Sequence, residues 1–429
     1  QLQNKIGRQE KLLGAWEDLT VLCEMGQEAD DADILEEVKT EYAALEERVE
    51  ELRRRDPQAE ISVFSDHSLA PYNPMLTTYY VGGKLPYEGL FPFGTLAEIG
   101  QRYEASFLTG TRAAKVDAQR RAVTLESGEA RSYDKILVST GATAFVPPSF
   151  AGVEGAFCMR TVDDAVGLKT ALEEREYRSA VVVGASMVGI KVAELFQRAG
   201  ARCVLADMAP SLFPLAAVPE VGTELGRRVT EKGVDLKLGV GLTAIDETPE
   251  GLKVAFGSDV LDADVAVLAI GTRPNLDFLD KDAPLVDRGV LVNERMETSV
   301  SGIYAAGDCA SGYNIQSGSH QVIGLWANAG YQGITAAGAM LGRRGNYPGN
   351  LLHNITHFMN MDFVGMGDNR RGGRDCILGT PDKGLYIHAV MDGDELAGVN
   401  ILDSYRVSGA VKNYFYRMLK GKGHALEDV

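Results

Sequence analysis

One segment constrains the fold more than any other, because a buried strand, a glycine-rich turn, a helix and a second strand follow one another in it. The strand covers Ser179–Val183, the turn covers Gly184–Gly189, the helix runs from Ile190 to Ala199, and the second strand covers Cys203–Ala206. A helix that carries the chain back to a second parallel strand is the unit from which α/β folds are built. The segment therefore predicts an α/β domain with a parallel sheet and crossover helices.

The same turn is a candidate binding site for the pyrophosphate of a dinucleotide. Gly184, Ser186 and Gly189 have the spacing of a G-x-G-x-x-G motif, with a serine at the middle glycine. Free N–H groups and the dipole at the N-terminus of the following helix attract phosphate. Asp207 ends the second strand, where a carboxylate accepts a hydrogen bond from the ribose 2′-hydroxyl and repels a 2′-phosphate. These residues predict NADH rather than NADPH; the alternative is an ordinary tight turn between strand and helix.

A second candidate nucleotide site follows a short apolar strand at 302–306. Gly307 lets the backbone approach a ligand closely, and Asp308 places a carboxylate at the carboxyl end of the strand. Ligands of open α/β sheets bind at that end, so this carboxylate is positioned to accept hydrogen bonds from ribose or ribityl hydroxyls. The alternative is an aspartate that caps the turn.

Residues from about 52 to 425 resemble the FAD-dependent pyridine nucleotide-disulfide oxidoreductases. The resemblance rests on the two nucleotide motifs and on further segments in the family's order, namely Ala70–Asn73, Thr140–Gly141 after the strand 134–139, Gly271 after the strand 265–270, and 324–333. The most similar branches are NADH oxidases, rubredoxin reductases and the reductase part of NAD(P)H-nitrite reductases.

The resemblance implies an α/β fold with two Rossmann-like domains, one of the FAD type and one of the NAD type, and a C-terminal α+β interface domain. The expected division is a helical hairpin over 1–57, the FAD-type domain over 58–148 and 272–345, the NAD-binding domain over 149–271 and the interface domain over 346–429. The interface domain often forms a dimer contact in the family, so a homodimer is expected. Apolar runs at 384–391 and 396–402 predict an antiparallel meander in it, followed by a helix at about 407–419.

The resemblance also implies that NADH reduces FAD and that the reduced flavin passes electrons to rubredoxin, another redox protein or a small oxidant. Lys191 lies near the start of the nucleotide helix, where related reductases often carry a glutamate close to the nicotinamide. We expect this lysine to steer the anionic cofactor or to stabilise reduced flavin; the alternative is a solvated helix lysine. Flavin contacts are expected at Asp66, Thr140, Gly141, Gly271, Gly307, Asp308 and Trp326.

The N-terminal residues 1–55 resemble a different family, the helical hairpin at the start of bacterial peptide-chain release factors. The Gly-Gly-Gln tripeptide that this family uses for hydrolysis is absent. The oxidoreductases begin with a strand, a G-x-G-x-x-G turn and a helix that bind the FAD pyrophosphate, and no such element precedes Ile61. We therefore expect FAD binding to be weakened or lost. The edges of the flanking strands are expected to be unpaired unless the hairpin or another chain covers them. Since the first residue is Gln1 rather than methionine, a fragment or a processed form is expected. The hairpin ahead of the incomplete first unit is expected in a chimera, a fragment or a natural gene fusion.

Composition argues against several other classes of protein. The net charge of −17 disfavours nonspecific binding of nucleic acid. No apolar run reaches the roughly 20 residues that cross a membrane. Five cysteines without a C-x-x-C pair predict reduced thiols and a cytoplasmic setting. The disulfide-reductase branch is disfavoured as well, because the segment 71–80 contains no cysteine.

Simpler explanations apply to the remaining polar residues. Cys309 has no partner cysteine nearby in the sequence and is expected to be a buried structural thiol. His353 and His357 are four residues apart, but no third ligand is evident, so no metal site is expected. His320, in a glycine- and serine-rich loop at 313–321, is a weaker candidate for substrate contact. The alternative to a flavoprotein is a flavin-free NAD-binding or structural protein that uses the hairpin as an interaction module.

Overall fold

The computed structural model describes residues 59–279, 288–382, 384–393 and 395–404, together with Val411 and Phe415. These last two residues are helical and fall within the helix expected at about 407–419. The hairpin expected over 1–57 lies outside the described residues. In the described part of the chain, no helix is long and apolar enough to cross a membrane.

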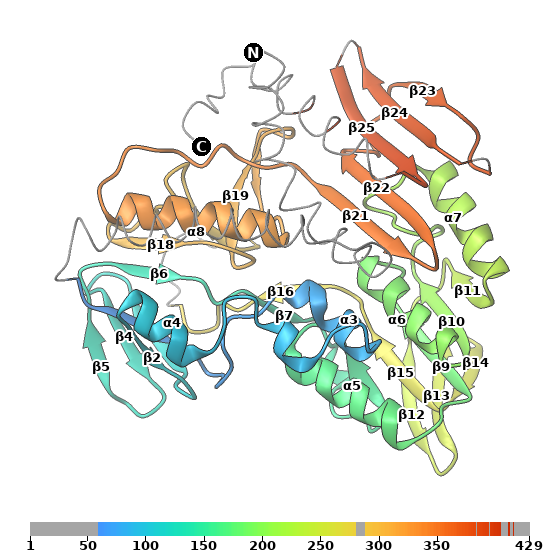
Figure 1. The fold of residues 1–429 in the computed structure, drawn as a ribbon, viewed down its shortest axis with the longest axis horizontal. Coiled ribbons are helices and arrows are strands. Elements are labelled where there is room, and N and C mark those ends of the chain that lie inside the picture. The colour runs from blue at the N-terminus through green and yellow to red at the C-terminus, as the bar shows by residue number, and fades with distance from the viewer. Residues whose placement is uncertain are drawn as a thin grey trace.

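A five-stranded parallel sheet forms the centre of one half of the molecule (Figure 1). Its central strand pairs with a parallel neighbour on each side, and the side chains of residues 181–183 are almost inaccessible to water. A strand buried on both faces is apolar throughout instead of alternating, which explains the run of three valines. In spatial order the strands are β11 (Val234–Leu238), β10 (Arg202–Asp207), β9 (Ser179–Val183), β15 (Val265–Leu268) and β8 (Ala156–Cys158).

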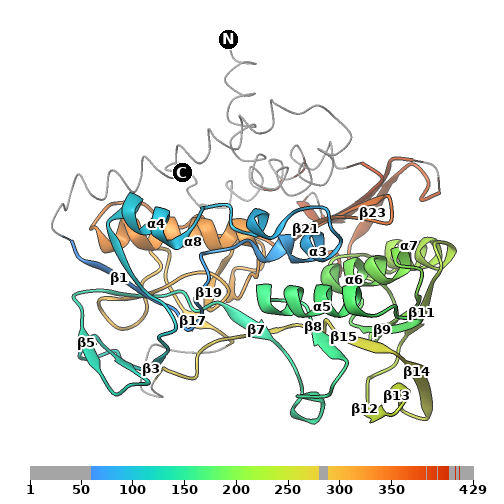
Figure 2. The ribbon, with the colours of Figure 1, turned by 60° about the horizontal axis from the view of Figure 1, so that its bottom comes forward.

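Helices cover one face of this sheet and an antiparallel meander covers the other (Figure 2). Val182 packs in the core on the helical side, whereas Val181 and Val183 pack against the meander. The nucleotide helix begins at Met187, three residues before the predicted start. The helices are α5 (Val162–Glu174), α6 (Met187–Arg198) and α7 (Pro219–Glu231), and the meander consists of β12 (Ala244–Thr248), β13 (Gly251–Phe256) and β14 (Asp259–Ala263).

The other half contains two separate pairs of parallel strands in place of one continuous sheet. β1 (Ile61–Phe64) pairs with β2 (Ala105–Leu108), and β6 (Ile136–Val138) pairs with β18 (Ile303–Ala305). A meander again connects the two pairs, from β2 to β6, and consists of β3 (Ala113–Asp117), β4 (Ala122–Leu125) and β5 (Ala130–Ser132).

The two halves repeat one topology, and the comparison identifies where they differ. β2, β1 and β6 hold the places of β11, β10 and β15, with a meander before the last strand in each half. β9 joins β10 to β15, but among the described residues no strand joins β1 to β6. The described part of this half therefore lacks the central strand, and with it the turn that would follow that strand.

Shorter elements complete this half and its connection to the first. Where the chain crosses between the halves, β7 (Ala142–Ala144) pairs with β16 (Thr272–Pro274) in antiparallel fashion. A hairpin of β19 (Ala310–Asn314) and β20 (Ser319–Gln321) occupies the segment expected to be a loop. The others are η1 (Pro74–Leu76), α3 (Thr77–Val81), η2 (Tyr87–Leu90), α4 (Leu96–Tyr103), η3 (Pro148–Phe150), β17 (Val290–Leu291) and α8 (Trp326–Met340).

The C-terminal sheet packs on the side of α6 and α7. Phe358, Phe363 and Leu402 share one apolar core with Phe196 of α6 and Leu225 of α7. The sheet is antiparallel, as predicted, with the strands β21 (His353–Phe358), β22 (Met361–Gly367), β25 (Glu395–Leu402), β24 (Tyr386–Asp392) and β23 (Arg374–Leu378) in spatial order.

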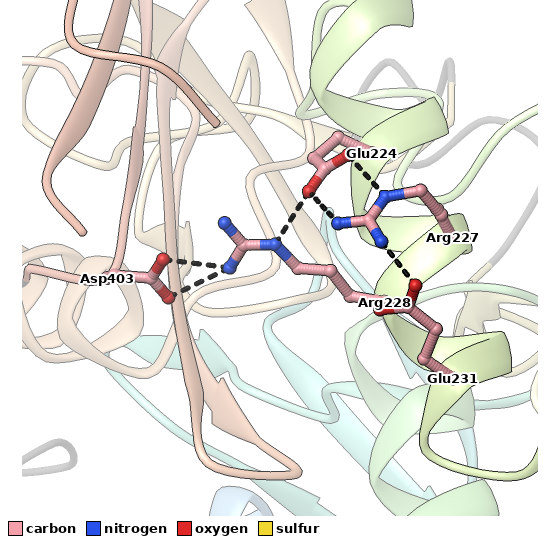
Figure 3. Close-up of polar contacts among 5 residues, drawn as sticks. All are labelled: Glu224, Arg227, Arg228, Glu231 and Asp403. Atoms are coloured by element: carbon pink, nitrogen blue, oxygen red, sulfur yellow. Dashed lines mark hydrogen bonds and ion pairs between the residues drawn. The ribbon is translucent and has the colours of Figure 1, made fainter. Parts of the chain in front are cut away.

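An ion-pair network also fixes the end of the C-terminal sheet to α7 (Figure 3). Arg228 donates to Glu224 (2.9 Å) on its own helix and to Asp403 (2.8 Å) just beyond β25. Arg227 binds Glu224 and Glu231, both on α7. Hydrogen bonds from the two arginines lower the pKa of Glu224 to about 2. The Arg228 side chain is only 12% exposed, so its pair with Asp403 is partly desolvated.

Arg228 joins α7 to the C-terminal sheet, whereas Arg227 binds only residues of its own helix. Substitutions of these two neighbouring arginines should therefore have unequal effects on stability. Arg228→Gln should lower the free energy of unfolding by roughly 1.5–3 kcal/mol, because a buried charged contact between two elements is lost. Arg227→Gln is the matched control and should cost less than about 1 kcal/mol, because its contacts are exposed and lie within one helix. Urea unfolding of both variants tests the prediction, and equal losses would show that the contact with Asp403 does not stabilise the docked sheet.

Candidate functional site

The turn between β9 and α6 allows an unusually close approach of backbone to backbone. Gly184 has a φ angle of 111°, and a Cβ atom there would overlap the carbonyl oxygen of Ala269. A Cβ atom at Gly189 would overlap the carbonyl oxygen of Gly184. Only glycine fits at these two positions, so the end of β15 and the first turn of α6 can lie directly against the turn.

Ser186 replaces the middle glycine of the motif and caps α6. Its backbone is extended, and its hydroxyl accepts a hydrogen bond from the N–H of Gly189 at 3.3 Å. Serine is among the preferred N-cap residues, so the departure from glycine gives the helix a regular start. The N-terminus of a 12-residue helix then lies at the carboxyl edge of the sheet, where it fits a pyrophosphate.

Asp207 is held beside this turn by two backbone amides. Its Oδ2 accepts a hydrogen bond from Ala185 N–H at 2.6 Å, and its Oδ1 accepts one from Ala209 N–H at 2.7 Å. A carboxylate has more acceptor positions than these two bonds use, so it can also bind ribose hydroxyls. The next residue, Met208, is 77% exposed and uncharged, so it supplies no cation for a 2′-phosphate.

We expect this site to bind NADH at least about tenfold more tightly than NADPH, a difference of about 1.4 kcal/mol. Asp207→Ala should narrow the difference, because the charge that repels a 2′-phosphate is removed. Asp235→Ala, which removes a carboxylate from the neighbouring strand β11, is the control and should leave the ratio unchanged. Titration of each variant with both nucleotides is the measurement, and equal affinities in the wild-type protein would contradict the assignment.

Asp308 lies three residues beyond β18, near the carboxyl end of that strand. Gly307 has a φ angle of 80° and donates its N–H to the side-chain oxygen of Gln332 at 2.8 Å. The carboxylate of Asp308 lies close to Gly324 and accepts a hydrogen bond from Nη2 of Arg160 at 2.5 Å. This hydrogen bond orients the carboxylate near the carboxyl end of the strand, and its contact with ribityl hydroxyls stays a prediction.

Hydrogen bonds of Asn275 join the two predicted glycine turns, at Gly141 and Gly271, where the chain crosses between the halves. Thr140 donates its hydroxyl to the carbonyl of Asn275 at 2.7 Å, and the Asn275 side-chain amide donates to the carbonyl of Thr140 at 3.0 Å. The N–H of Asn275 also donates to the carbonyl of Gly141. Gly141 and Gly271 both have positive φ angles with open space where a side chain would be. Thr140 thus connects the two crossovers, a role that the sequence did not predict.

Asp66 and Trp326 are the other two side chains that the resemblance assigns to the flavin site. Asp66 lies two residues beyond β1, whereas Asp207 is the last residue of β10, and the carboxylate of Asp66 is exposed, 3.6 Å from the ring of His67. Trp326 is the first residue of α8 and is half-buried, with its ring 6.1 Å from that of Phe93. Contacts of these two residues with a flavin stay predictions.

Lys191 extends from α6 to the other half of the molecule. Its ammonium group donates to the hydroxyl of Tyr79 on α3 at 2.8 Å and lies 4.7 Å from the centre of that ring. A cleft of about 650 Å³ borders this contact, lined also by Lys84 and Arg198, and it runs along α6 away from the glycine turn. The ammonium group of Lys191 is therefore not freely solvated.

The histidines and Cys309 have structural partners. Cys309 is fully buried and its Sγ contacts the carbonyl of Val138, and burial raises the pKa of this thiol. His357 contacts Asp362 at 2.7 Å, His353 lies next to the carbonyl of Leu351, and His320 lies next to that of Val292. Within the described ranges, no three His, Cys, Asp or Glu side chains lie close enough to hold a metal ion.

Sequence reasoning missed three residues of this region: Arg160, Tyr79 and Asn275. Each acts through a partner more than 100 positions away in the chain. A signal for Arg160 was available, because it directly precedes the capping box of α5, formed by Thr161 and Asp164, which fixes its backbone. No comparable local signal marks Tyr79.

Comparison with known proteins supports the assignment of two nucleotide sites. The profile of the family described as pyridine nucleotide-disulphide oxidoreductase matches residues 46–333. The epsilon subunit of NADH-dependent phenylglyoxylate dehydrogenase from Aromatoleum evansii is 26% identical over 388 residues, which is 88% of this chain and 90% of that protein. The nitric oxide reductase FlRd-NAD(+) reductase of an Escherichia coli strain is 26% identical over 356 residues, 82% of this chain and 91% of that protein.

Solved structures show the same fold. The water-forming NADH oxidase from Lactobacillus brevis, bound to NADH, has a TM-score of 0.80 and 20% identity, with 88% of each chain covered. The putidaredoxin reductase–putidaredoxin complex has a TM-score of 0.78 and 22% identity, covering 87% of this chain and 90% of that one. The predicted α/β fold class with Rossmann-like nucleotide-binding domains is thereby confirmed.

Proposed function

Because the chain belongs to the pyridine nucleotide-disulphide oxidoreductase family, we propose that it is an NADH-dependent flavoprotein that passes electrons to a redox protein or a small oxidant. Membership confirms the predicted class of enzyme, an FAD-dependent oxidoreductase that uses a pyridine nucleotide. The observation that carries the choice of donor is the carboxylate of Asp207, bound to the backbone of the nucleotide turn. When bound, FAD would supply the redox chemistry by taking a hydride from the nicotinamide.

Each half of the molecule would bind one of the two cofactors. Residues 149–271 would bind NADH through the turn at Gly184 and through Asp207, and 58–148 with 272–345 would bind FAD through Asp66 and Asp308. The hydrogen-bonded crossovers at Thr140 and Asn275 support this division, because they tie the halves together where the chain passes between them. Residues 346–429 would form the interface domain; a homodimer through it and a cytoplasmic setting stay predictions.

We place Lys191 at the point where the two halves exchange electrons. A cation there would attract the anionic nucleotide and stabilise the negative charge of reduced flavin. The contact with Tyr79 supports this role, because it directs the ammonium group toward the FAD-type half and holds it in one position.

Lys191→Gln should slow reduction of the flavin by NADH about tenfold, or about 1.4 kcal/mol of barrier, and should lower the flavin reduction potential. Lys169→Gln is a matched control, since Lys169 on α5 also lies over a tyrosine ring, that of the adjacent Tyr80 at 5.0 Å, but donates to the backbone carbonyl of Tyr80 (3.2 Å) instead of the hydroxyl. Anaerobic stopped-flow reduction and a redox titration are the measurements. Equal changes of the reduction rate and of the potential in the two variants would show that Lys191 has no specific role in flavin reduction.

For the electron acceptor, the relatives favour a small redox protein. One relative is named nitric oxide reductase FlRd-NAD(+) reductase, and one structural neighbour is a putidaredoxin reductase in complex with putidaredoxin. The test is anaerobic reduction of the FAD-loaded protein with NADH, followed by mixing with rubredoxin, a [2Fe–2S] ferredoxin or dioxygen. Reoxidation by one of the proteins at least about tenfold faster than by dioxygen would support a carrier; the reverse would support a small oxidant. If NADH does not bleach the flavin absorbance, the proposed function is wrong.

The described part of the flavin site has no element that would bind the FAD pyrophosphate. The described residues provide Asp66 and Asp308 for hydroxyl groups, but no glycine turn for the pyrophosphate between β1 and β6. Two charged hydrogen bonds, at roughly 1.5–3 kcal/mol each, correspond to about 10²- to 10⁴-fold in affinity. We therefore expect the chain to purify largely without FAD and to bind added FAD weakly.

Replacing residues 1–52 by a strand, a G-x-G-x-x-G turn and a helix should restore FAD retention. The same graft with its three glycines changed to valine is the control, because it supplies the strand without room for the phosphates. The ratio of flavin to protein after gel filtration is the measurement. Stoichiometric FAD in the unmodified chain would mean that other residues already bind the pyrophosphate.

A flavin-free protein that binds only NADH is the second candidate. The split between the two strand pairs is the observation that favours it, because the complete nucleotide turn lies in the other half. Absorbance in the flavin bands after addition of FAD and removal of the excess separates the two candidates.

A further inference from the structure

We infer that the cleft between α3 and α6 is a second binding site, separate from the dinucleotide turn, and that its ligand is a small multivalent oxyanion, a diphosphate or a tricarboxylate. It is the cleft of about 650 Å³ that borders the contact between Lys191 and Tyr79. Small-molecule sites usually measure roughly 300–1,000 Å³, so the volume fits such a ligand. The inference goes beyond the proposed function, because it does not depend on whether the chain retains FAD.

The cleft is separate from the glycine turn along the chain and along the helix. Its lining on α6 begins at Lys191 and continues to the end of the helix at Arg198, and it includes none of the turn residues 184–189. The turn lies at the N-terminus of α6, whereas the cleft follows the rest of that helix. A ligand in the cleft therefore does not occupy the place of the NADH pyrophosphate.

The lining of the cleft is cationic although the chain as a whole is acidic. The formal net charge of the chain is −17, yet five basic and two acidic side chains line the cleft. They are Lys84, Arg175, Arg178, Lys191 and Arg198, with Glu176 and Glu194. Glu194 is buried and pairs with Arg198 at 2.8 Å. A concave surface lined mainly by one sign of charge concentrates ions of the opposite sign, so the cleft attracts anions.

Helix capping explains two of these cations but not the other three. Arg175 is the C-cap of α5 and Arg198 is the last residue of α6, where a cation offsets the partial negative charge of the helix end. Lys191 lies near the start of α6, and Lys84 lies three residues beyond α3. Arg178 directly precedes β9, and its side chain has no ion-pair partner among the described residues. These three cations need a different explanation, which an anionic ligand supplies.

Two of the three lie around one aromatic ring. Nζ of Lys84 is 5.2 Å from the centre of the Tyr79 ring, and Nζ of Lys191 is 4.7 Å from it. Like charges held near the same ring repel each other, and an oxyanion that accepts hydrogen bonds from both ammonium groups would offset this repulsion. The hydroxyl of Tyr79 accepts from Lys191 and has its own hydrogen to donate. We therefore place the anion beside Tyr79.

The walls of the cleft come from both halves of the molecule. Lys84 follows α3, which lies in the chain between β1 and β2, whereas Arg178 lies at the edge of the five-stranded sheet. A ligand with several negative charges can contact cations on both walls, whereas a single small anion uses only those near Tyr79. The distribution of the cations thus favours a multivalent anion.

The test is titration calorimetry of the full chain with inorganic pyrophosphate and with citrate, each in the presence of saturating NADH. At least one anion should bind with a Kd below about 1 mM. Tighter binding of pyrophosphate would identify a phosphate ligand, and tighter binding of citrate would identify a carboxylate ligand; both results support the site. Binding of neither anion at about 10 mM would overturn the inference.

Substitution of Lys84 locates the bound anion. Lys84→Gln should weaken binding about tenfold, and Lys84→Arg, which keeps the charge, should weaken it less than about threefold. Lys169→Gln is the matched control, because Nζ of Lys169 lies 5.0 Å from the ring of the adjacent Tyr80 but this lysine is not part of the lining. It should leave the affinity unchanged. Equal losses in Lys84→Gln and Lys169→Gln would overturn the inference, because they would indicate nonspecific attraction.

Two further measurements separate the cleft from the dinucleotide turn. Arg178→Gln, on the opposite wall, should weaken anion binding by roughly threefold, and Lys84→Gln should leave the affinity for NADH within about twofold. If saturating NADH abolishes a binding of pyrophosphate that is seen without it, the anion binds at the glycine turn and the inference is wrong. Each of the overturning results would leave the proposed function intact, because none of them measures flavin reduction.

Discussion

The contact on which most of the structure depends is the packing of the turn 184–189 against the carbonyl group of Ala269. It has room for no Cβ atom, so it fixes β9, β15 and the first turn of α6 relative to one another. The rest of α6 then organises its surroundings. Lys191 contacts Tyr79 on α3, and the buried Glu194 pairs with Arg198 and accepts the N–H of Met359 from the C-terminal sheet at 3.0 Å. One helix thus positions the nucleotide site, the border with the other half and the last sheet.

Local patterns in the sequence predicted the parts of this structure that depend on neighbouring residues. The apolar runs at Ser179–Val183 and around Ile303–Ala305 became strands because their side chains are buried and β-branched residues favour extended backbone. One antiparallel strand ends at Asp392 and the next begins at Glu395, on the two sides of the turn that the composition indicated. The start of α6 was misplaced by three residues, because the capping role of Ser186 outweighs the preference for apolar residues at the start of the helix.

The side-chain contacts that link the halves could not be predicted, for a physical reason. Arg160 and Asp308, Thr140 and Asn275, and Lys191 and Tyr79 are pairs separated by 148, 135 and 112 positions. Each depends on how two domains pack, and hydrophobic periodicity carries no information about that packing. The separation of β1 from β6 is different: the missing glycine motif predicted it, because the central strand of such a sheet and its turn belong to one continuous segment.

The two nucleotide sites therefore differ in what holds them together. At the NAD turn, the phosphate-binding helix, the ribose carboxylate and the amides that orient that carboxylate all lie within residues 184–209. At the flavin site, the orienting group for Asp308 comes from the other half, and the pyrophosphate has no turn among the described residues. A site assembled from one segment keeps its geometry when the halves move, whereas a site assembled across them does not. NADH binding should consequently be the more robust property of this chain, and flavin binding should depend on how firmly Arg160 and the crossovers hold the two halves together.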